Sequence, residues 1–280
     1  MMNNTITKTL RALTLIVLVP LMAAACTTSG PSSGTSFGEP ADVDGALAAE
    51  LLTRAAEEGE NDLVRFALAS GANIDAQDPE NGKTPLILAA ERGHVRTVAL
   101  LIENGAGIDT TSAEQWTPLV YAAARGQPDV ARLLIGAGAD IEVREPSGGY
   151  TPLMIAALLG QTSLISPLVE AGADVNARSD QGGAGALAVA AASSGERNLV
   201  TMAELLVAGS NLNAQDDDGA TPLMGAVRAS NADAVNLLLS SGADATIADF
   251  NGETALDIAQ QEGMEAISRQ ITESVGKGET

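Results

Sequence analysis

The stretch that decides the fold runs from Thr84 to Ala106 and reads TPLILAAERGHVRTVALLIENGA. Thr84 is a suitable helix cap, and Pro85 fits the first helical position, where an amide hydrogen would have no partner. The apolar residues between Pro85 and Gly93 predict a short helix, and those between Gly93 and Gly105 predict a second one. Glycine is the usual residue at a helix end, so the stretch predicts two short helices joined by a turn.

The same pattern recurs along the chain. One leucine per unit marks the start of the first helix, in or near a Thr-Pro-Leu motif: Leu86, Leu119, Leu153, Leu187, Leu223 and Leu256. A glycine followed by Ala or Ser ends each unit, at Gly71, Gly105, Gly138, Gly172, Gly209 and Gly242. Two series that stay in phase indicate an array of repeats in which only stacked units bury a core.

The Thr-Pro-Leu motif, the paired alanines after it, the Gly-Ala-Asp end and the period near 33 residues resemble ankyrin repeats. The resemblance covers residues 46–272 and implies an all-α ankyrin-repeat solenoid of about seven helix-turn-helix units with short hairpin-like turns. We expect an N-terminal pair at 46–78, five central units at 79–247 and a C-terminal pair at 248–272. Residues 273–280 are expected to form a polar C-terminal tail.

Two places depart from the regular unit. The unit at 179–215 lacks Thr-Pro and carries additional residues around 193–198, which predict a longer loop. Pro167 falls inside a second helix, where it removes one backbone hydrogen bond and should kink or shorten that helix. Regularity is therefore expected to fall in the second half of the array.

Composition excludes several kinds of site. The 280 residues carry 15 Lys and Arg against 36 Asp and Glu, a net charge of −21, which repels nucleic acid backbones. One Cys and one His exclude an internal disulfide, zinc sites of two or four cysteines and multi-histidine metal sites. Phosphate-loop and dinucleotide fingerprints are missing from the sequence, so we expect no cofactor and no metal.

The N-terminus has the pattern of a secretory signal peptide over residues 1–25. Lys8 and Arg11 precede the apolar run 12–25, which ends in small residues. That run is interrupted by Pro20 and is too short for a membrane-spanning helix, which needs about 20 apolar residues. The sequence therefore predicts an exported protein.

Cys26, the single cysteine, follows three alanines and resembles the lipid-attachment cysteine of the bacterial lipoprotein lipobox. The resemblance implies lipidation at Cys26, and Thr27 favours the outer membrane, facing the periplasm. The alternative is an ordinary signal peptide cleaved after alanine. Residues 26–45 are rich in Ser, Thr, Gly and Pro, which predicts a flexible, lipid-anchored linker. Membrane contact is expected only through this anchor.

Several short motifs resemble catalytic or metal-binding patterns but lack their context. Gly30–Gly34 matches a nucleophile elbow without the strand and helix that it requires, and Ser274–Lys277 falls in the predicted tail. Asp216–Gly219 lacks the other ligands of a calcium loop, which favours an ordinary turn between repeats. His94 is expected to be a structural turn residue.

A partner of an ankyrin protein usually meets the turn tips and the concave side of the first helices. Trp116 and Tyr150 precede the motif in neighbouring units, and Arg125, Leu158 and Leu159 follow the paired alanines. Large aromatic residues are strong interface anchors, so these five residues are the predicted protein-binding patch. The alternative is that the two aromatic rings only cover turn backbone.

Other residues near the patch have different predicted roles. Glu114, Asp140 and Glu145 are expected to form an acidic rim around it. Tyr121 occupies a core position in its helix, which predicts packing.

The resemblance implies a non-enzymatic protein-binding module, a scaffold or adaptor held in the bacterial cell envelope. We expect a monomer whose protein partner has a basic surface, because the chain is strongly acidic. One alternative is an inhibitor or immunity-type binder of an exported toxin or enzyme. Another is an enzymatic site in the irregular region 179–230.

Overall fold

The computed structural model describes residues 45–193 and 195–278. The chain divides into two units, 1–41 and 42–280, and every described helix lies in the second. The predicted signal peptide, Cys26, the linker up to residue 44 and the Gly30–Gly34 motif lie outside the described residues.

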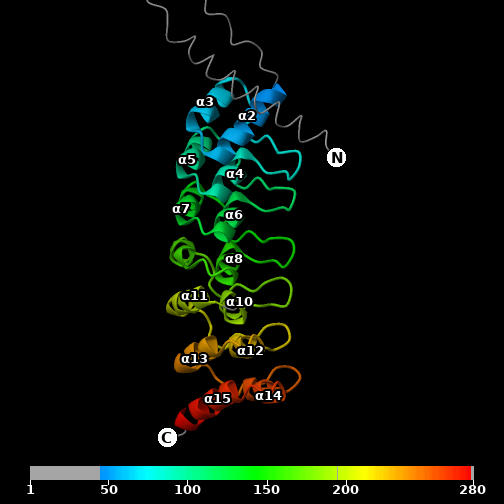
Figure 1. The fold of residues 1–280 in the computed structure, drawn as a ribbon, viewed down its shortest axis with the longest axis vertical. Helices are drawn as coiled ribbons and strands as arrows, with labels where there is room; N and C mark the ends of the chain where they lie inside the picture. The colour runs from blue at the N-terminus through cyan, green and yellow to red at the C-terminus, as the bar shows by residue number, and fades with distance from the viewer. Residues whose placement is uncertain (1–44, 194, 279–280) are drawn as a thin grey trace, which may run out of the picture. The chain divides into compact units, whose positions relative to one another are not determined.

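Fourteen α-helices and one 3₁₀ turn, η1, form seven pairs in the described residues (Figure 1). In chain order the pairs are α2 (Gly45–Glu58) with α3 (Asn61–Ala69), α4 (Pro85–Arg92) with α5 (Val95–Glu103), α6 (Pro118–Arg125) with α7 (Pro128–Gly136), α8 (Pro152–Leu158) with η1 (Thr162–Leu164) and α9 (Ile165–Glu170), α10 (Ala186–Ala192) with α11 (Glu196–Val207), α12 (Pro222–Arg228) with α13 (Ala232–Ser240), and α14 (Ala255–Gln261) with α15 (Glu265–Gly278). The predicted all-α solenoid of about seven helix-turn-helix units is confirmed.

The pairs stack so that like helices contact like helices. First helices pack on first helices, as α4 does on α6, and second helices pack on second helices, as α5 does on α7. Figure 1 shows the two columns, with the turns projecting from the side of the first helices away from the second ones. This stacking places equivalent residues of successive units next to each other.

The Thr-Pro motif starts the first helices in the predicted way. The Thr84 side chain accepts a hydrogen bond from the backbone N–H of Ile87, and Pro85 occupies the first turn. Thr117, Thr151 and Thr221 do the same in their units. Gly93 ends α4 in the left-handed conformation, at φ 78°. Gly185, in the unit without Thr-Pro, makes no side-chain cap.

The core lies between the two columns and between successive first helices. In α4 every residue from Pro85 to Ala90 is buried, because neighbouring pairs cover both sides of the helix. The alanines let the helices approach closely, while Leu86 and Leu101 fill the space between the columns. Complete burial of one such leucine stabilises the fold by roughly 1.5–3 kcal/mol.

The second helices show where the regular pattern changes. Pro167 lies in α9, which has 6 residues and follows the 3₁₀ turn η1, whereas α5 has 9. The proline lacks the N–H that would continue an upstream helix, so the predicted shortening is confirmed.

The longer loop predicted at 193–198 is not found: α11 begins at Glu196 and has 12 residues. The additional residues extend α11 instead, because Asn198 in its first turn is buried and donates its amide to Ala190 O of α10.

The C-terminal end also differs from the expected boundary. α15 continues to Gly278, through most of the segment 273–280 that we expected to be a polar tail. Ile267 and Ile271 are both buried and stand four residues apart, which keeps one face of this helix on the array. The Ser274–Lys277 motif therefore lies within a helix.

Candidate functional site

The five residues of the predicted patch come from two neighbouring units. Trp116 and Tyr150 lie in the turns before α6 and α8, Arg125 and Leu158 end these two helices, and Leu159 follows Leu158. α6 packs directly on α8. The structure thus brings the five residues onto successive units of one array.

Leu158 and Leu159 are exposed at the end of α8, to 39% and 48% of their surface. The equivalent positions of the other central units hold polar, charged or small residues, such as Glu91 and Arg92 at the end of α4. Two adjacent exposed leucines are therefore a feature of this unit and not of the repeat.

Trp116 packs on the ring of Tyr121, with ring centroids 5.3 Å apart and planes tilted by 57°. Tyr121 is buried, which confirms its predicted packing role, and its hydroxyl donates to Glu114 at 2.8 Å and lies 3.2 Å from Ser112 Oγ. Burial, together with the Glu114 carboxylate, raises the pKa of Tyr121 to about 12. The hydroxyl therefore remains a hydrogen-bond donor at neutral pH.

A charged network lies beside this aromatic pair. Lys83 Nζ is 4.5 Å from the Tyr121 ring centroid and 2.5 Å from a Glu91 carboxylate oxygen. Arg125 reaches the other oxygen of Glu91 at 2.6 Å. Burial alone would raise the pKa of Glu91, but the hydrogen bonds from Lys83 and Arg125 outweigh it and lower the pKa. Arg125, predicted as a contact residue, is thus also part of a network that joins two units.

Lys83 and Glu91 are not among the five residues of the predicted patch. Alignment of the repeat units places both residues next to positions of the predicted patch. Lys83 occupies the position before the Thr-Pro motif that Trp116 occupies in the next unit. Arg125 directly follows Ala124, which is the equivalent of Glu91 in that unit.

Tyr150 covers turn backbone, as the alternative for this residue proposed. A Cβ atom added to Gly148 would lie 2.7 Å from Tyr150 Cε2, so the ring lies directly on this glycine. Tyr150 is nevertheless only partly buried. The ring therefore has one side on the turn and leaves surface available to a partner.

Glu145 was wrongly assigned to an acidic rim. Only 3% of its surface is exposed, and its carboxylate accepts hydrogen bonds from Ser147, the Gly148 N–H at 2.6 Å and the Tyr150 N–H at 3.3 Å. Burial raises the pKa of Glu145, but the hydrogen bonds lower it by more, so the pKa lies below its ordinary value. Glu145 therefore holds its own turn together. Glu114 and Asp140 remain exposed.

The same turn position explains the Asp216–Gly219 motif. Asp216 accepts the backbone N–H groups of Asp218 at 3.0 Å and Ala220 at 2.8 Å. The carboxylate thus closes the turn, and no group of three or more His, Cys, Asp or Glu residues suited to a metal ion occurs in the described part of the chain. His94 is also structural, because its Nε2 donates to Glu57 O at 2.9 Å.

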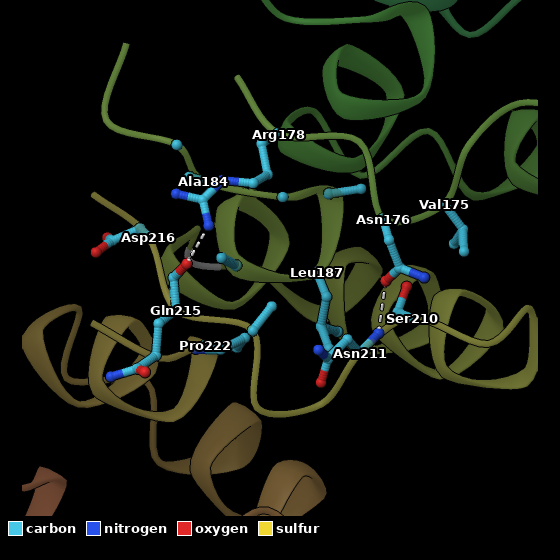
Figure 2. A pocket seen from close by; sticks show the side chains of 15 residues that line it. Val175, Asn176, Arg178, Ala184, Leu187, Ser210, Asn211, Gln215, Asp216 and Pro222 are labelled. Carbon is cyan, nitrogen blue, oxygen red and sulfur yellow. Dashed lines mark hydrogen bonds between the residues drawn. The ribbon is translucent and has the colours of Figure 1, made fainter. Parts of the chain in front are cut away.

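A cavity of about 30 Å³ lies in the irregular region, between the segments that carry Asn176 and Asn211 (Figure 2). This volume holds about one water molecule.

Among the described residues, no helix is both long and apolar enough to cross a membrane.

Comparison with known proteins agrees with this architecture. The family model described as "Ankyrin repeats (3 copies)" matches residues 52–145 and 187–277, and the model "Ankyrin repeat" matches 148–180. Among solved structures, the crystal structure of the human ASB11 ankyrin repeat domain is similar, with a TM-score of 0.69 and 24% identity. The match covers 80% of this chain and 96% of that one. The chain belongs to the ankyrin-repeat family, whose members typically bind proteins and are not enzymes.

Proposed function

We propose that this protein is a non-enzymatic scaffold that binds a protein partner through Trp116, Arg125, Tyr150, Leu158 and Leu159. The exposed leucine pair at the end of α8 carries the proposal, because contiguous exposed apolar surface is characteristic of interaction sites. Trp116 and Tyr150, each partly buried, are held by packing and lose little freedom on binding. The net charge of −21 favours a partner with a basic surface.

The patch is tested by affinity capture with the complete mature protein. The variant Trp116→Ala with Tyr150→Ala should lose the captured partner while its helical circular dichroism is unchanged. Val207→Ala is the matched control, because Val207 is an apolar residue that is 90% exposed on another helix, α11. Equal capture by the double variant and by wild type would show that the patch is not the binding site.

The proposed anchoring in the bacterial envelope depends on Cys26. The apolar run and the three alanines before this cysteine support lipid attachment there. Expressed in a bacterium with lipoprotein processing, Cys26→Ala should leave the protein in the soluble envelope fraction, while wild type should partition with membranes. A Cys26→Ala protein that is correctly cleaved yet stays in the membrane fraction would exclude the lipid anchor.

A further inference from the structure

The turns before the first helices are joined to one another by backbone hydrogen bonds. At four of the five junctions between successive turns, an N–H near the tip of one turn donates to a carbonyl of the preceding turn. The bonds are Ala113 N to Asn81 O at 3.0 Å, Asp180 N to Gly148 O at 3.0 Å, Asp217 N to Gly182 O at 2.9 Å and Phe250 N to Asp218 O at 2.9 Å. The turns thus form a ladder along one edge of the array.

The ladder is interrupted between the turns 112–117 and 145–151, which we name the open junction. The residue whose N–H would donate there is Pro146, and proline has no N–H. The equivalent acceptor, Glu114 O, receives no hydrogen bond from the described residues. A single proline, Pro146, thus accounts for the missing backbone hydrogen bond.

Side chains form a second series between turns, and it stops at the same place. Arg144 donates to Arg178 O at 2.7 Å. Arg178 donates in turn to Gln215 O at 2.6 Å (Figure 2). Gln77 and Gln215 make equivalent bonds to Thr111 O and Ala248 O. The residue of this series at the open junction is Thr111, which is too short to reach the next turn. Arg144 O accordingly receives no hydrogen bond from the described part of the chain.

A third observation concerns the glycines of the turns. A Cβ atom on Gly82 would lie 2.6 Å from Ala113 N, and one on Gly219 would lie 2.7 Å from Phe250 Cδ1, because the next turn packs over each glycine. At the open junction this position is Gln115, with φ 59°, and it carries a real side chain. In the last turn, which no further turn follows, a Cβ on Gly252 would meet nothing within 4 Å. The tip of the Gln115 turn thus resembles the tip of the last turn, although Asp109 earlier in the same loop accepts the Asp140 N–H of the next unit at 3.2 Å.

The junctions that follow show what chemistry fits such a place. The Arg144 guanidinium donates to Gly149 O at 3.0 Å and to Arg178 O, and pairs with Asp180 at 3.0 Å. Arg178 pairs in the same way with Asp217, at 2.7 Å. Turn carbonyls at these register positions therefore receive a planar group with several donors well. The open junction offers the equivalent carbonyls, those of Gln115 and Arg144, without an arginine of its own.

We propose that the open junction receives an arginine side chain of the protein partner. The inference rests on the proposed function, because Trp116 and Tyr150 lie in the two turns that border the junction. Arginine also stacks on aromatic rings, and the exposed Glu114 carboxylate adds favourable charge. The partner is thus a protein that presents an arginine on a protruding loop or end.

The test uses a minimal probe, the peptide acetyl-Gly-Arg-Gly-amide, titrated into the ¹⁵N-labelled mature protein. Wild type should show saturable amide shifts at residues 113–116 and 147–150 and at the Trp116 indole. The peptide in which citrulline replaces arginine keeps the shape without the charge, and should bind at least tenfold more weakly. Missing shifts at the open junction, or equal shifts with citrulline, would overturn the proposal.

Closing the junction is the matched variant. Thr111→Arg with Pro146→Asp copies the Arg144–Asp180 and Arg178–Asp217 pairs and should abolish the shifts at 113–116. If this double variant does not fold, Thr111→Arg alone serves under the same criterion, and unchanged peptide binding in the folded variant overturns the proposal. Conversely, Arg178→Thr with Asp217→Pro should create a second binding site near Gly183.

The two proposals fail in distinguishable ways. If capture of the native partner survives Trp116→Ala with Tyr150→Ala while the peptide still binds wild type, the proposed patch is wrong and the arginine site stands. If capture depends on the two aromatic residues but the peptide does not bind, the patch stands and the arginine site is wrong.

Discussion

At the scale of single residues, one polar side chain closes each turn before a first helix, although its polarity alone would suggest an exposed residue. Asp78, Ser112, Glu145, Ser179, Asp216 and Asp249 are equivalent, and each side chain accepts backbone N–H groups of its own turn. An acidic or hydroxyl side chain in a loop normally predicts solvent exposure. The sequence therefore could not separate Glu145, which is buried, from the exposed Glu114 in the neighbouring turn.

Glu145→Gln tests this role. An amide keeps one acceptor oxygen but turns an NH₂ group towards N–H donors, so the variant should lose about 1–3 kcal/mol of unfolding free energy at pH 7. The folded state lowers the pKa of Glu145, so its contribution is present above the unfolded value and is lost as the pH falls through the folded one. Wild type should thus lose more stability than the variant below about pH 4.5.

Urea denaturation at pH 7 and across the acid range measures both effects. Glu170→Gln is the control, because Glu170 is exposed at the end of α9 and should change stability little. Identical pH profiles for wild type and Glu145→Gln would contradict the assignment.

At the scale of helices, local capping signals predicted most of the array, and packing decided the rest. Thr-Pro motifs fixed the starts of α4, α6, α8 and α12, and Pro167 predicted the short α9. The lengths of α11 and α15 were not predicted, because both depend on burial against the preceding pair. Asn198 and Ile271 read as ordinary polar and terminal residues until their neighbours are known.

The unit without a Thr cap offers a stabilising substitution. Gly185 has φ −90° and ψ 172°, close to the −81° and 163° of Thr84, and an added Cβ would lie 3.5 Å from Ala177 O, an ordinary contact. Gly185→Thr should therefore cap α10 and raise the unfolding free energy by about 1 kcal/mol. Thr221→Ala, which removes the same cap from α12, should lower it by a similar amount. A Gly185→Thr protein with an unchanged or lower urea midpoint would show that its turn cannot adopt the capped geometry.

At the scale of the whole molecule, the repeat period predicted the architecture, but the relation between turns was not visible in any single unit. Pro146 and Thr111 are unremarkable turn residues, and each only removes a bond that the neighbouring junctions make. The effect emerges when all turns are compared in register. The sequence placed Trp116 and Tyr150 on successive turns, but it could not show that the hydrogen bonds between those two turns are missing. That became visible only in the folded structure.

The charge of the whole molecule leads to a final prediction. With a net charge of −21, the folded chain repels itself, and raising the ionic strength from about 0.01 M to about 0.1 M shortens the screening length from roughly 30 Å to roughly 10 Å. The melting temperature should therefore rise with salt, while binding of the arginine peptide should weaken. The opposite signs separate the two effects, since screening removes repulsion within the chain and attraction to the probe. NaCl and KCl should have the same effect, because screening depends on ionic strength. Calorimetry measures the melting temperature, and titration measures the affinity for the peptide. A melting temperature that falls with salt would mean that ion pairs such as Glu91 with Lys83 and Arg125 outweigh the repulsion.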